Sequence, residues 1–234
     1  MKVLTWNIMQ GGSQQRLAKI SDILVAHDPD VLVLTEFWEG PKGDFIRQRL
    51  RNAGWHDQYS SGAAPKENGL LIASKRTLSP QPPSIVPAER HRWMEVAVQE
   101  LRILAVHIPM GPPKPLFWAK VLERAQQLVT GPALIIGDFN TGLPVDTEGT
   151  AFECGDSFER LLITGWHDAW RLKNGSHQEF SWYSHAKKKK NGFRLDHALV
   201  SDTIRDKVIS CCYSHDERTA RYSDHSALIV QLDL

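Results

Sequence analysis

The arrangement of apolar residues constrains the fold most, because strand-like and helix-like patterns alternate along the chain. Residues 3–6 (VLTW) and 31–34 (VLVL) are short, mainly apolar runs, typical of strands that are covered on both faces. Between them, the apolar residues Leu17, Ile20 and Leu24 recur at helical spacing and predict an amphipathic helix over about residues 14–27. Such mixing of the two patterns is typical of α/β domains.

The same patterns predict the remaining elements. The proline-rich stretch 79–88 is too short to separate two domains, so we interpret it as a surface loop and expect residues 1–234 to form one domain. We expect helices at about 42–53, 116–129 and 156–164, strands at 69–73, 133–137, 195–200 and 227–232, and a hairpin of strands at 95–99 and 102–107.

Composition excludes several classes of protein. Of the 234 residues, 41% are hydrophobic and 24% are charged, the balance of an ordinary globular chain. The three cysteines (Cys154, Cys211 and Cys212) form no CxxC pair and their number is odd, so a disulfide framework or structural zinc site is not expected. The sequence has neither a secretory signal pattern nor an apolar run of roughly 20 residues. We therefore expect a cytoplasmic protein with no membrane association and no obligate protein partner.

Positive charge is concentrated in one stretch of the chain. The formal net charge is only +1, yet residues 171–194 hold seven Lys or Arg against the single acid Glu179. This excess favours a phosphate-facing patch. A solvated lysine loop is the alternative, and the run Lys187, Lys188, Lys189 and Lys190 is compatible with either interpretation.

Polar residues suited to metal or phosphate chemistry stand at the ends of most predicted strands. Polar groups on one rim of a sheet can converge on a single cleft. Taken singly, each would be an ordinary turn, cap or core residue, but together they supply the parts of one reaction. They are Asn7, Glu36, His107, Asp138, Asn140, Asp196, Asp224 and His225.

These residue types match the needs of phosphodiester hydrolysis. Magnesium prefers hard oxygen ligands such as carboxylates, and it polarises a phosphoryl group and neutralises a leaving oxygen. Attack also needs a positioned base for water. A histidine that donates to the phosphate stabilises the transition state, and a carboxylate can hold that histidine charged. Asparagine amides position water or phosphate without adding negative charge.

The motifs resemble those of the endonuclease/exonuclease/phosphatase superfamily. The resemblance rests on Trp6-Asn7, Glu36, Gly-Asp-Phe-Asn at 137–140 and Ser-Asp-His at 223–225, in this order over nearly the whole chain. It implies an α/β fold of the deoxyribonuclease-I-like type, a four-layer sandwich in which helices flank two mixed β-sheets.

Two stretches are similar to the exonuclease III and abasic-site endonuclease branch. They are Asp168-Ala169-Trp170-Arg171 with its sequel Phe180-Ser181-Trp182-Tyr183, and Gly192-Phe193-Arg194-Leu195-Asp196. Three features depart from that branch: Thr35 and Trp38 around Glu36, His107 where the branch has tyrosine, and residues 141–144.

The resemblance implies roles for individual positions. Glu36 would bind Mg²⁺ (or Mn²⁺ as a substitute), with Asn7 beside it and Asp224 nearby. Asp138 would orient or deprotonate water, Asn140 would contact the phosphate, and His225, paired with Asp196, would donate to it. Trp182, Phe193 and Leu195 would form a pocket for a flipped-out abasic sugar. Arg194 and Lys187 to Lys190 are expected on the substrate side, and His107 in the catalytic set.

These observations predict a magnesium-dependent DNA phosphodiesterase, acting as a 3′-end exonuclease, an abasic-site endonuclease, or both. The alternative is a phosphatase or phosphodiesterase for lipid headgroups, inositol phosphates or small nucleotides, which the near-neutral charge favours. A non-catalytic nucleic-acid-binding module is a third hypothesis, and the complete set of acid, amide and histidine positions argues against it.

Overall fold

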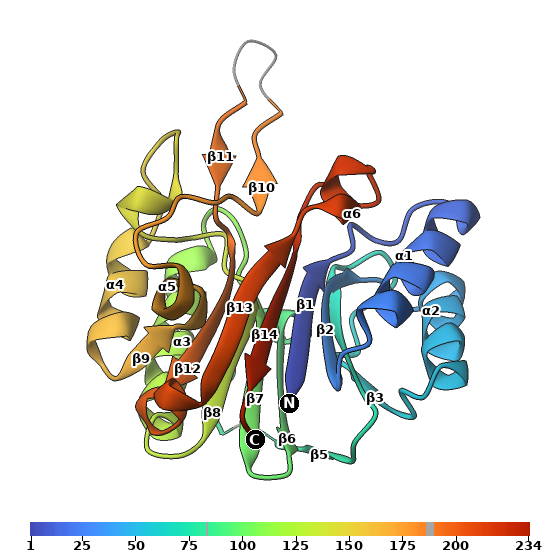
Figure 1. Cartoon of the computed structure of the whole chain (residues 1–234), viewed down its shortest axis with the longest axis horizontal. Helices are drawn as coiled ribbons and strands as arrows, with labels where there is room; N and C mark the ends of the chain where they lie inside the picture. Colours follow the sequence, from blue (N-terminus) through green and yellow to red (C-terminus); the bar gives the residue numbers. More distant parts are fainter. Residues whose placement is uncertain (83, 186–189) are drawn as a thin grey trace.

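Two six-stranded mixed sheets face each other in the computed structural model, which describes residues 1–82, 84–185 and 190–234 (Figure 1). Sheet A has the order β13-β14-β1-β2-β4-β3, and sheet B has the order β5-β6-β7-β8-β12-β9. The strands of sheet A are β1 (Lys2–Asn7), β2 (Val31–Phe37), β3 (Asp57–Ser60), β4 (Gly69–Ser74), β13 (Val208–Ser214) and β14 (Ala227–Leu232). Those of sheet B are β5 (Leu78–Pro80), β6 (Trp93–Val98), β7 (Leu101–His107), β8 (Ala133–Asp138), β9 (Trp166–Asp168) and β12 (Asp196–Ser201).

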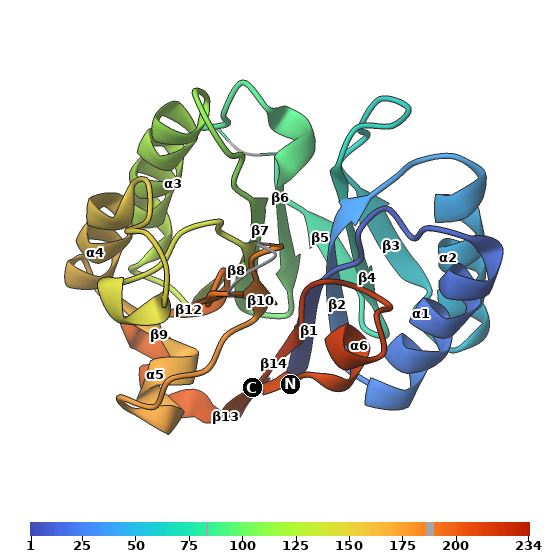
Figure 2. The same ribbon diagram turned by 90° about the horizontal axis from the view of Figure 1, so that it is seen from above.

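Helices cover the outer face of each sheet, which gives four layers (Figure 2). Helices α1 (Gln14–His27) and α2 (Pro41–Asn52) pack on sheet A, and α3 (Lys114–Leu128) and α4 (Gly155–Ile163) pack on sheet B. Two helices are short: α5 (Ala169–Asn174) comes before β13 in the chain, and α6 (Asp216–Thr219) comes after it. Strand β10 (Trp182–Tyr183) pairs with β11 (Gly192–Phe193) in a separate two-stranded sheet. The expected deoxyribonuclease-I-like sandwich is therefore confirmed.

The alternation of side chains along each strand builds two kinds of core. Val3, Val31 and Val33 point between the sheets, where they join residues of sheet B in one buried cluster. Their neighbours Leu4 and Leu32 point to the other face and pack under α1 and α2. A strand that is buried on both faces has no solvent-exposed face that would need polar residues. This burial explains the continuous apolar runs in the sequence.

Most predicted elements are present with bounds shifted by one or two residues. Helix α1 occupies the predicted range, and Ser13 caps it by accepting a hydrogen bond from the Arg16 N–H over 3.3 Å. The predicted hairpin is formed by β6 and β7 in antiparallel register. The helices and strands that were not predicted are mostly short: β3, β5, β9, β10, β11, β13, α5 and α6. Of the helices in the described ranges, none is long and apolar enough to cross a membrane.

The topology brings several strand ends to one edge of the sandwich. Parallel strands β1 and β2 end there at Asn7 and Phe37, and parallel strands β7 and β8 end there at His107 and Asp138. Antiparallel strands β12 and β14 begin at the same edge, because they run opposite to β8 and β1. The hairpin of β10 and β11 rises beyond this edge, next to α6 (Figure 1).

Gly137 is required by the close approach of β7 and β8. It has φ of +142°, and an added Cβ would lie 2.0 Å from the backbone oxygen of Val106. Gly137→Ala is therefore expected to destabilise the fold by about 3 kcal/mol through clash and backbone strain. For a chain of this size, that loss lowers the melting temperature by roughly 6–12 °C.

Thermal unfolding of purified variants tests this prediction, with Gly131→Ala as the control. A Cβ at Gly131 would meet nothing within 4 Å, so that variant should melt like the wild type. Equal melting temperatures for both variants would contradict the proposed packing constraint.

Candidate active site

The polar residues expected at strand ends line one cavity at the edge where β1, β2, β7 and β8 end. Its volume is about 870 Å³, within the usual range of ligand pockets. Of the predicted site residues, the cavity is lined by Asn7, Glu36, His107, Asp138, Asn140, Trp182, Phe193, Leu195, Asp224 and His225. Asp196 lies beneath, fully buried.

The floor of the cavity holds a histidine paired with a carboxylate from the opposite sheet. His225 precedes β14 of sheet A, and its Nδ1 lies 2.8 Å from Oδ2 of Asp196 at the start of β12 in sheet B. Burial lowers the pKa of His225, but the negative charges of Asp196 and Asp138 outweigh this effect and raise the pKa to about 10. The imidazole is therefore a cation at neutral pH, and its Nε2–H is a charged donor.

Asp138 lies beside this pair because β8 and β12 are in register at Asp138 and Asp196. Its Oδ2 accepts a hydrogen bond from Nδ2 of Asn7 over 3.1 Å and lies 3.9 Å from Nε2 of His225. Burial, and then the charge of Asp196, raise the pKa of Asp138 to about 7. A carboxylate with such a pKa is suited to accept a proton near neutral pH.

Glu36 reaches the cavity from an irregularity in β2. The register of β2 with β4 shifts between Thr35 and Phe37, and Glu36 itself has a left-handed φ of 53°. Gln10 donates a side-chain hydrogen bond to the Glu36 carboxylate. Burial is the main cause that raises the pKa of Glu36, and the charge of Asp224 adds to it. A strained backbone at a polar, partly buried residue is typical of a functional position.

The donor chemistry fits a hard divalent cation near Glu36. Burial and the nearby charge of Asp224 raise the pKa of Glu36, and a cation bound beside this carboxylate would stabilise its charged form. Donor atoms of Asp138, Asp196 and His225 also come within 4.8 Å of one another. A protonated imidazole has no lone pair for a metal, however, so the Glu36 side of the cavity is the better match.

Asn7 and Asn140 serve mainly to fix neighbouring groups. The Asn7 Oδ1 accepts a hydrogen bond from the Met9 N–H over 3.0 Å, while its amide nitrogen faces Asp138. Asn140 has a φ of 48°, its backbone N–H donates to Asp138 Oδ1 over 2.9 Å, and its Nδ2 donates to the Ile108 carbonyl over 2.9 Å. The side-chain amide of Asn7 and the backbone N–H of Asn140 therefore both hold the Asp138 carboxylate in place.

His107 is in contact with an arginine that the sequence analysis missed. Nη1 of Arg92 lies 2.9 Å from Nδ1 of His107, and Arg92 also lines the cavity. Burial, and then the Arg92 charge, lower the pKa of His107 well below its usual value, so this imidazole is neutral. Arg92 lies in a 3-10 turn after the proline-rich loop, away from the strand-end pattern, and the basic triplet at 90–92 was its only signal.

Aromatic side chains form one wall of the cavity. The ring centroids of Trp182 and Phe193 are 5.7 Å apart, and those of Phe193 and Phe152 are 5.8 Å apart. An isolated bridge pairs Trp182 with His225, and the Trp182 Nε1–H donates to Asp224 Oδ2 over 3.0 Å. Phe152, which the sequence analysis did not select, completes this wall.

Leu195 and Phe193 reach the cavity because strand pairing is interrupted before Asp196. Strand β11 ends at Phe193 and β12 begins only at Asp196. Backbone N–H groups of Leu195 and Asp196 both donate to the buried hydroxyl of Ser181, over 3.0 and 3.2 Å. This irregular start breaks the alternation that would otherwise send these side chains away from the site.

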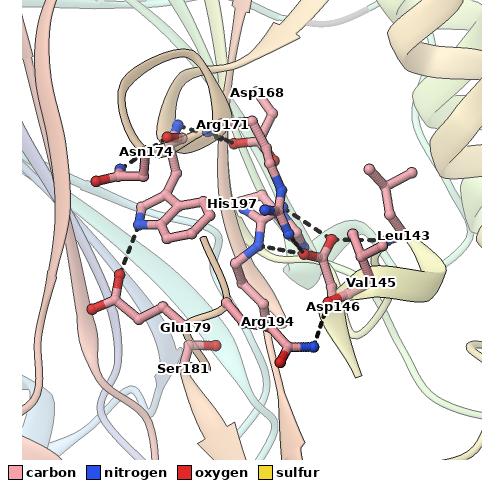
Figure 3. Close-up of polar contacts among 12 residues, drawn as sticks. Leu143, Val145, Asp146, Asp168, Arg171, Asn174, Glu179, Ser181, Arg194 and His197 are labelled. Atoms are coloured by element: carbon pink, nitrogen blue, oxygen red, sulfur yellow. Dashed lines mark hydrogen bonds and ion pairs between the residues drawn. The ribbon is translucent and has the colours of Figure 1, made fainter. Parts of the chain in front are cut away.

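Arg194 was expected to contact substrate, and the structure contradicts this expectation (Figure 3). The side chain is fully buried, and its guanidinium binds Asp146 over 2.8 and 2.9 Å and Asp168 over 2.6 Å. Burial alone would raise the pKa of Asp168, but the charge of Arg194 outweighs this effect and lowers the pKa below its usual value. This carboxylate therefore stays ionised. Arg194 therefore ties the loop at 144–147 to α5 and the start of β12.

The predicted lysine run is only partly described. Lys187, Lys188 and Lys189 lie outside the described residues. Lys190 is exposed and lines a second cavity that adjoins the first.

The fold and the cavity define a hydrolase of phosphate esters. The model of the family described as "Endonuclease/Exonuclease/phosphatase family" matches residues 4–225. The chain belongs to this family and is therefore an enzyme of the phosphodiester hydrolase class.

Solved structures share the complete fold at low identity. An AP endonuclease from Archaeoglobus fulgidus has 19% identity and a TM-score of 0.85. A 3′–5′ exonuclease (NExo) from Neisseria meningitidis has 23% identity and a TM-score of 0.84. A structure of the 3′ phosphatase NExo from Neisseria bound to a product DNA hairpin has 23% identity and a TM-score of 0.82. In all three comparisons, 100% of each chain is covered.

Proposed function

We propose that this chain is a magnesium-dependent nuclease of the exonuclease III and abasic-site endonuclease branch, acting on DNA at 3′ ends, at abasic sites, or at both. The observation that carries the proposal is the charged His225, held between Asp196 and Asp138 at the floor of a cavity that also presents Glu36. One cavity thus offers a cationic donor, a base and a candidate metal ligand.

His225 would bind the scissile phosphate through its Nε2–H. The hydrogen bond from a charged donor in a buried site becomes stronger as negative charge grows on the phosphate oxygens. Loss of one such interaction typically slows turnover about 10²–10³-fold. Asp196 keeps the proton on this imidazole and fixes its orientation through the bond to Nδ1.

Asp138 would orient the attacking water and accept its proton. Its pKa of about 7 suits this transfer, and the hydrogen bonds from Asn7 and from the Asn140 N–H hold the carboxylate in place. Glu36, with Asn7 and Asp224 beside it, would hold Mg²⁺ (or Mn²⁺), whose chemistry is polarisation of the phosphoryl group and neutralisation of the leaving oxygen.

The aromatic wall favours an abasic site among possible substrates. Trp182, Phe193 and Leu195 provide apolar surface beside the reacting groups, which suits a sugar without a base. The similar structures are named as an AP endonuclease, a 3′ phosphatase and a 3′–5′ exonuclease. These names match the proposed action at abasic sites or at 3′ ends. A phosphatase or phosphodiesterase for lipid headgroups, inositol phosphates or small nucleotides is the alternative, supported by the net charge of +1.

The proposal is tested with a panel of abasic duplex, blunt duplex, single-stranded DNA, RNA and a phosphoinositide, assayed with Mg²⁺ and with excess chelator. We expect cleavage of DNA that is lost on chelation. In the Glu36→Gln variant, activity at low Mg²⁺ should fall by about 10²-fold or more, because the anionic oxygen ligand is removed.

The matched control is Glu123→Gln, which changes an exposed glutamate on α3 and should behave like the wild type. Full activity in excess chelator would contradict the metal requirement. Hydrolysis of the phosphoinositide alone would replace the nuclease proposal with the alternative.

A second prediction concerns the aromatic wall. Trp182→Ala and Phe193→Ala should each lower abasic-site cleavage about 10-fold more than hydrolysis of bis(p-nitrophenyl) phosphate, because the small ester does not fill the apolar pocket. Phe152→Ala should show the same preference. Rates on both substrates and the melting temperature are measured for each variant.

Tyr59→Ala is the control, since Tyr59 is a partly exposed aromatic residue on β3 and does not line the cavity. If the wall variants lose both activities equally and melt much earlier than the wild type, these aromatics are core residues and the abasic-site specificity is wrong.

A further inference from the structure

A second cavity of about 610 Å³ lies between α6 and the paired strands β10 and β11. It is lined by the cationic side chains of Lys190, Arg218 and Arg221, together with Tyr183 and His185. Asp224 lines both this cavity and the catalytic one, so the two are adjacent across a single side chain. We call it the α6 cavity.

The charge of the α6 cavity is strongly positive. Among the described residues, no carboxylate oxygen lies within 4.0 Å of the cationic groups of Lys190, Arg218 or Arg221. Asp224 is its one acidic lining residue, and it is already bound by the Trp182 Nε1–H and lies 3.5 Å from Nε2 of His185. Apart from Asp224, the three cationic side chains have no acidic lining residue beside them in the described part of this cavity.

Arg218 is held in place by its neighbours. Its guanidinium lies 4.5 Å from the centroid of the Tyr183 ring, and its Nε donates to the Ser226 hydroxyl over 3.0 Å. Arg221 follows in a tight turn, with a left-handed φ of 61° and a backbone N–H that donates to the Arg218 carbonyl over 3.0 Å. Arg221 lines the cavity, and its guanidinium has no ion-pair partner among the described residues.

We propose that the α6 cavity binds a backbone phosphate of the DNA strand next to the phosphate that is cleaved. This inference rests on the proposed nuclease function and extends it to a second contact on the same strand. Stacked and free guanidinium groups are the preferred protein partners of phosphate oxygens. Because the two cavities meet at Asp224, a strand whose scissile phosphate lies against His225 continues directly into the α6 cavity.

The test measures binding of a short fluorescent DNA duplex by anisotropy, without divalent metal, over a series of salt concentrations. We expect Arg221→Gln and Lys190→Gln each to raise the Kd at low salt by roughly 10-fold, the loss of one charge-assisted contact. Each should also flatten the salt dependence, by at most about 0.9 in log–log slope, the value for complete loss of one phosphate contact. Arg205→Gln changes an exposed arginine in the 3-10 helix before β13 (Asp202–Lys207); it is the matched control and should bind like the wild type.

A second arm identifies the ligand as a strand phosphate. Neutral methylphosphonate linkages replace single phosphates on either side of the cleavage position. At one linkage, the replacement should weaken DNA binding by the wild type roughly 10-fold but should have little effect on binding by Arg221→Gln. The two changes remove the same contact, so their effects on binding free energy should not add. The same penalty in both proteins at every linkage would overturn the proposal.

The two proposals fail in different ways. If the wild type cleaves DNA with Mg²⁺ while Arg221→Gln and Lys190→Gln keep the wild-type Kd and salt slope, the α6 cavity is not a phosphate site and the nuclease function stands. If the variants lose binding as expected but the wild type cleaves no DNA in the substrate panel, the strand contact stands and the nuclease function is wrong.

Discussion

The hydrogen bond between His225 and Asp196 is the interaction on which the site depends, because it joins the two sheets across the buried edge of the sandwich. Asp196 begins β12 of one sheet, and His225 lies two residues before β14 of the other. The distance between their side chains therefore depends on how the two sheets are positioned. Removing either charged partner would leave the other buried and unpaired, which is strongly unfavourable. Asp196 Oδ1 has no hydrogen-bond partner among the described atoms, so Asp196 depends all the more on its bond to His225.

A second buried network supports the walls of the cavity. Arg194 binds Asp146 and Asp168, and Arg171 donates a further hydrogen bond to Asp146. Thr147, next to Asp146, forms a bridge with Phe193, and this link places the aromatic wall beside the catalytic floor. The ion pairs of Arg194 thus position residues of the cavity without touching it, as Figure 3 shows for the Arg194 contacts.

The sequence predicted the parts that depend on local pattern. Apolar runs and helical spacing predicted most strands and the four longer helices, and polar residues at strand ends predicted the residues that meet in the cavity. Strand β13 was missed because it is an edge strand with a register shift near Val208, and Ile209, Ser210 and Cys212 are exposed. Its apolar pattern is therefore interrupted.

Residues placed by tertiary contacts could not be assigned from the sequence. A conspicuous arginine beside Asp196 suggests a phosphate contact, whereas only the fold shows that Arg194 faces Asp146 and Asp168. Arg92 enters the cavity from a short 3-10 turn and Phe152 from a loop, and neither segment has a periodicity that predicts where its side chains point.

The central claim is that the buried carboxylates hold His225 as a cation, and NMR titration of imidazole nitrogens tests it most directly. In metal-free protein with ¹⁵N-labelled histidine, and with the His225 signals assigned by their loss in His225→Gln, we expect a pKa near 10 and an imidazolium at pH 7. Asp196→Asn should lower this pKa, because it removes the largest of the causes that raise it. A His225 that titrates at or below about 6.5 in the wild type would contradict the account.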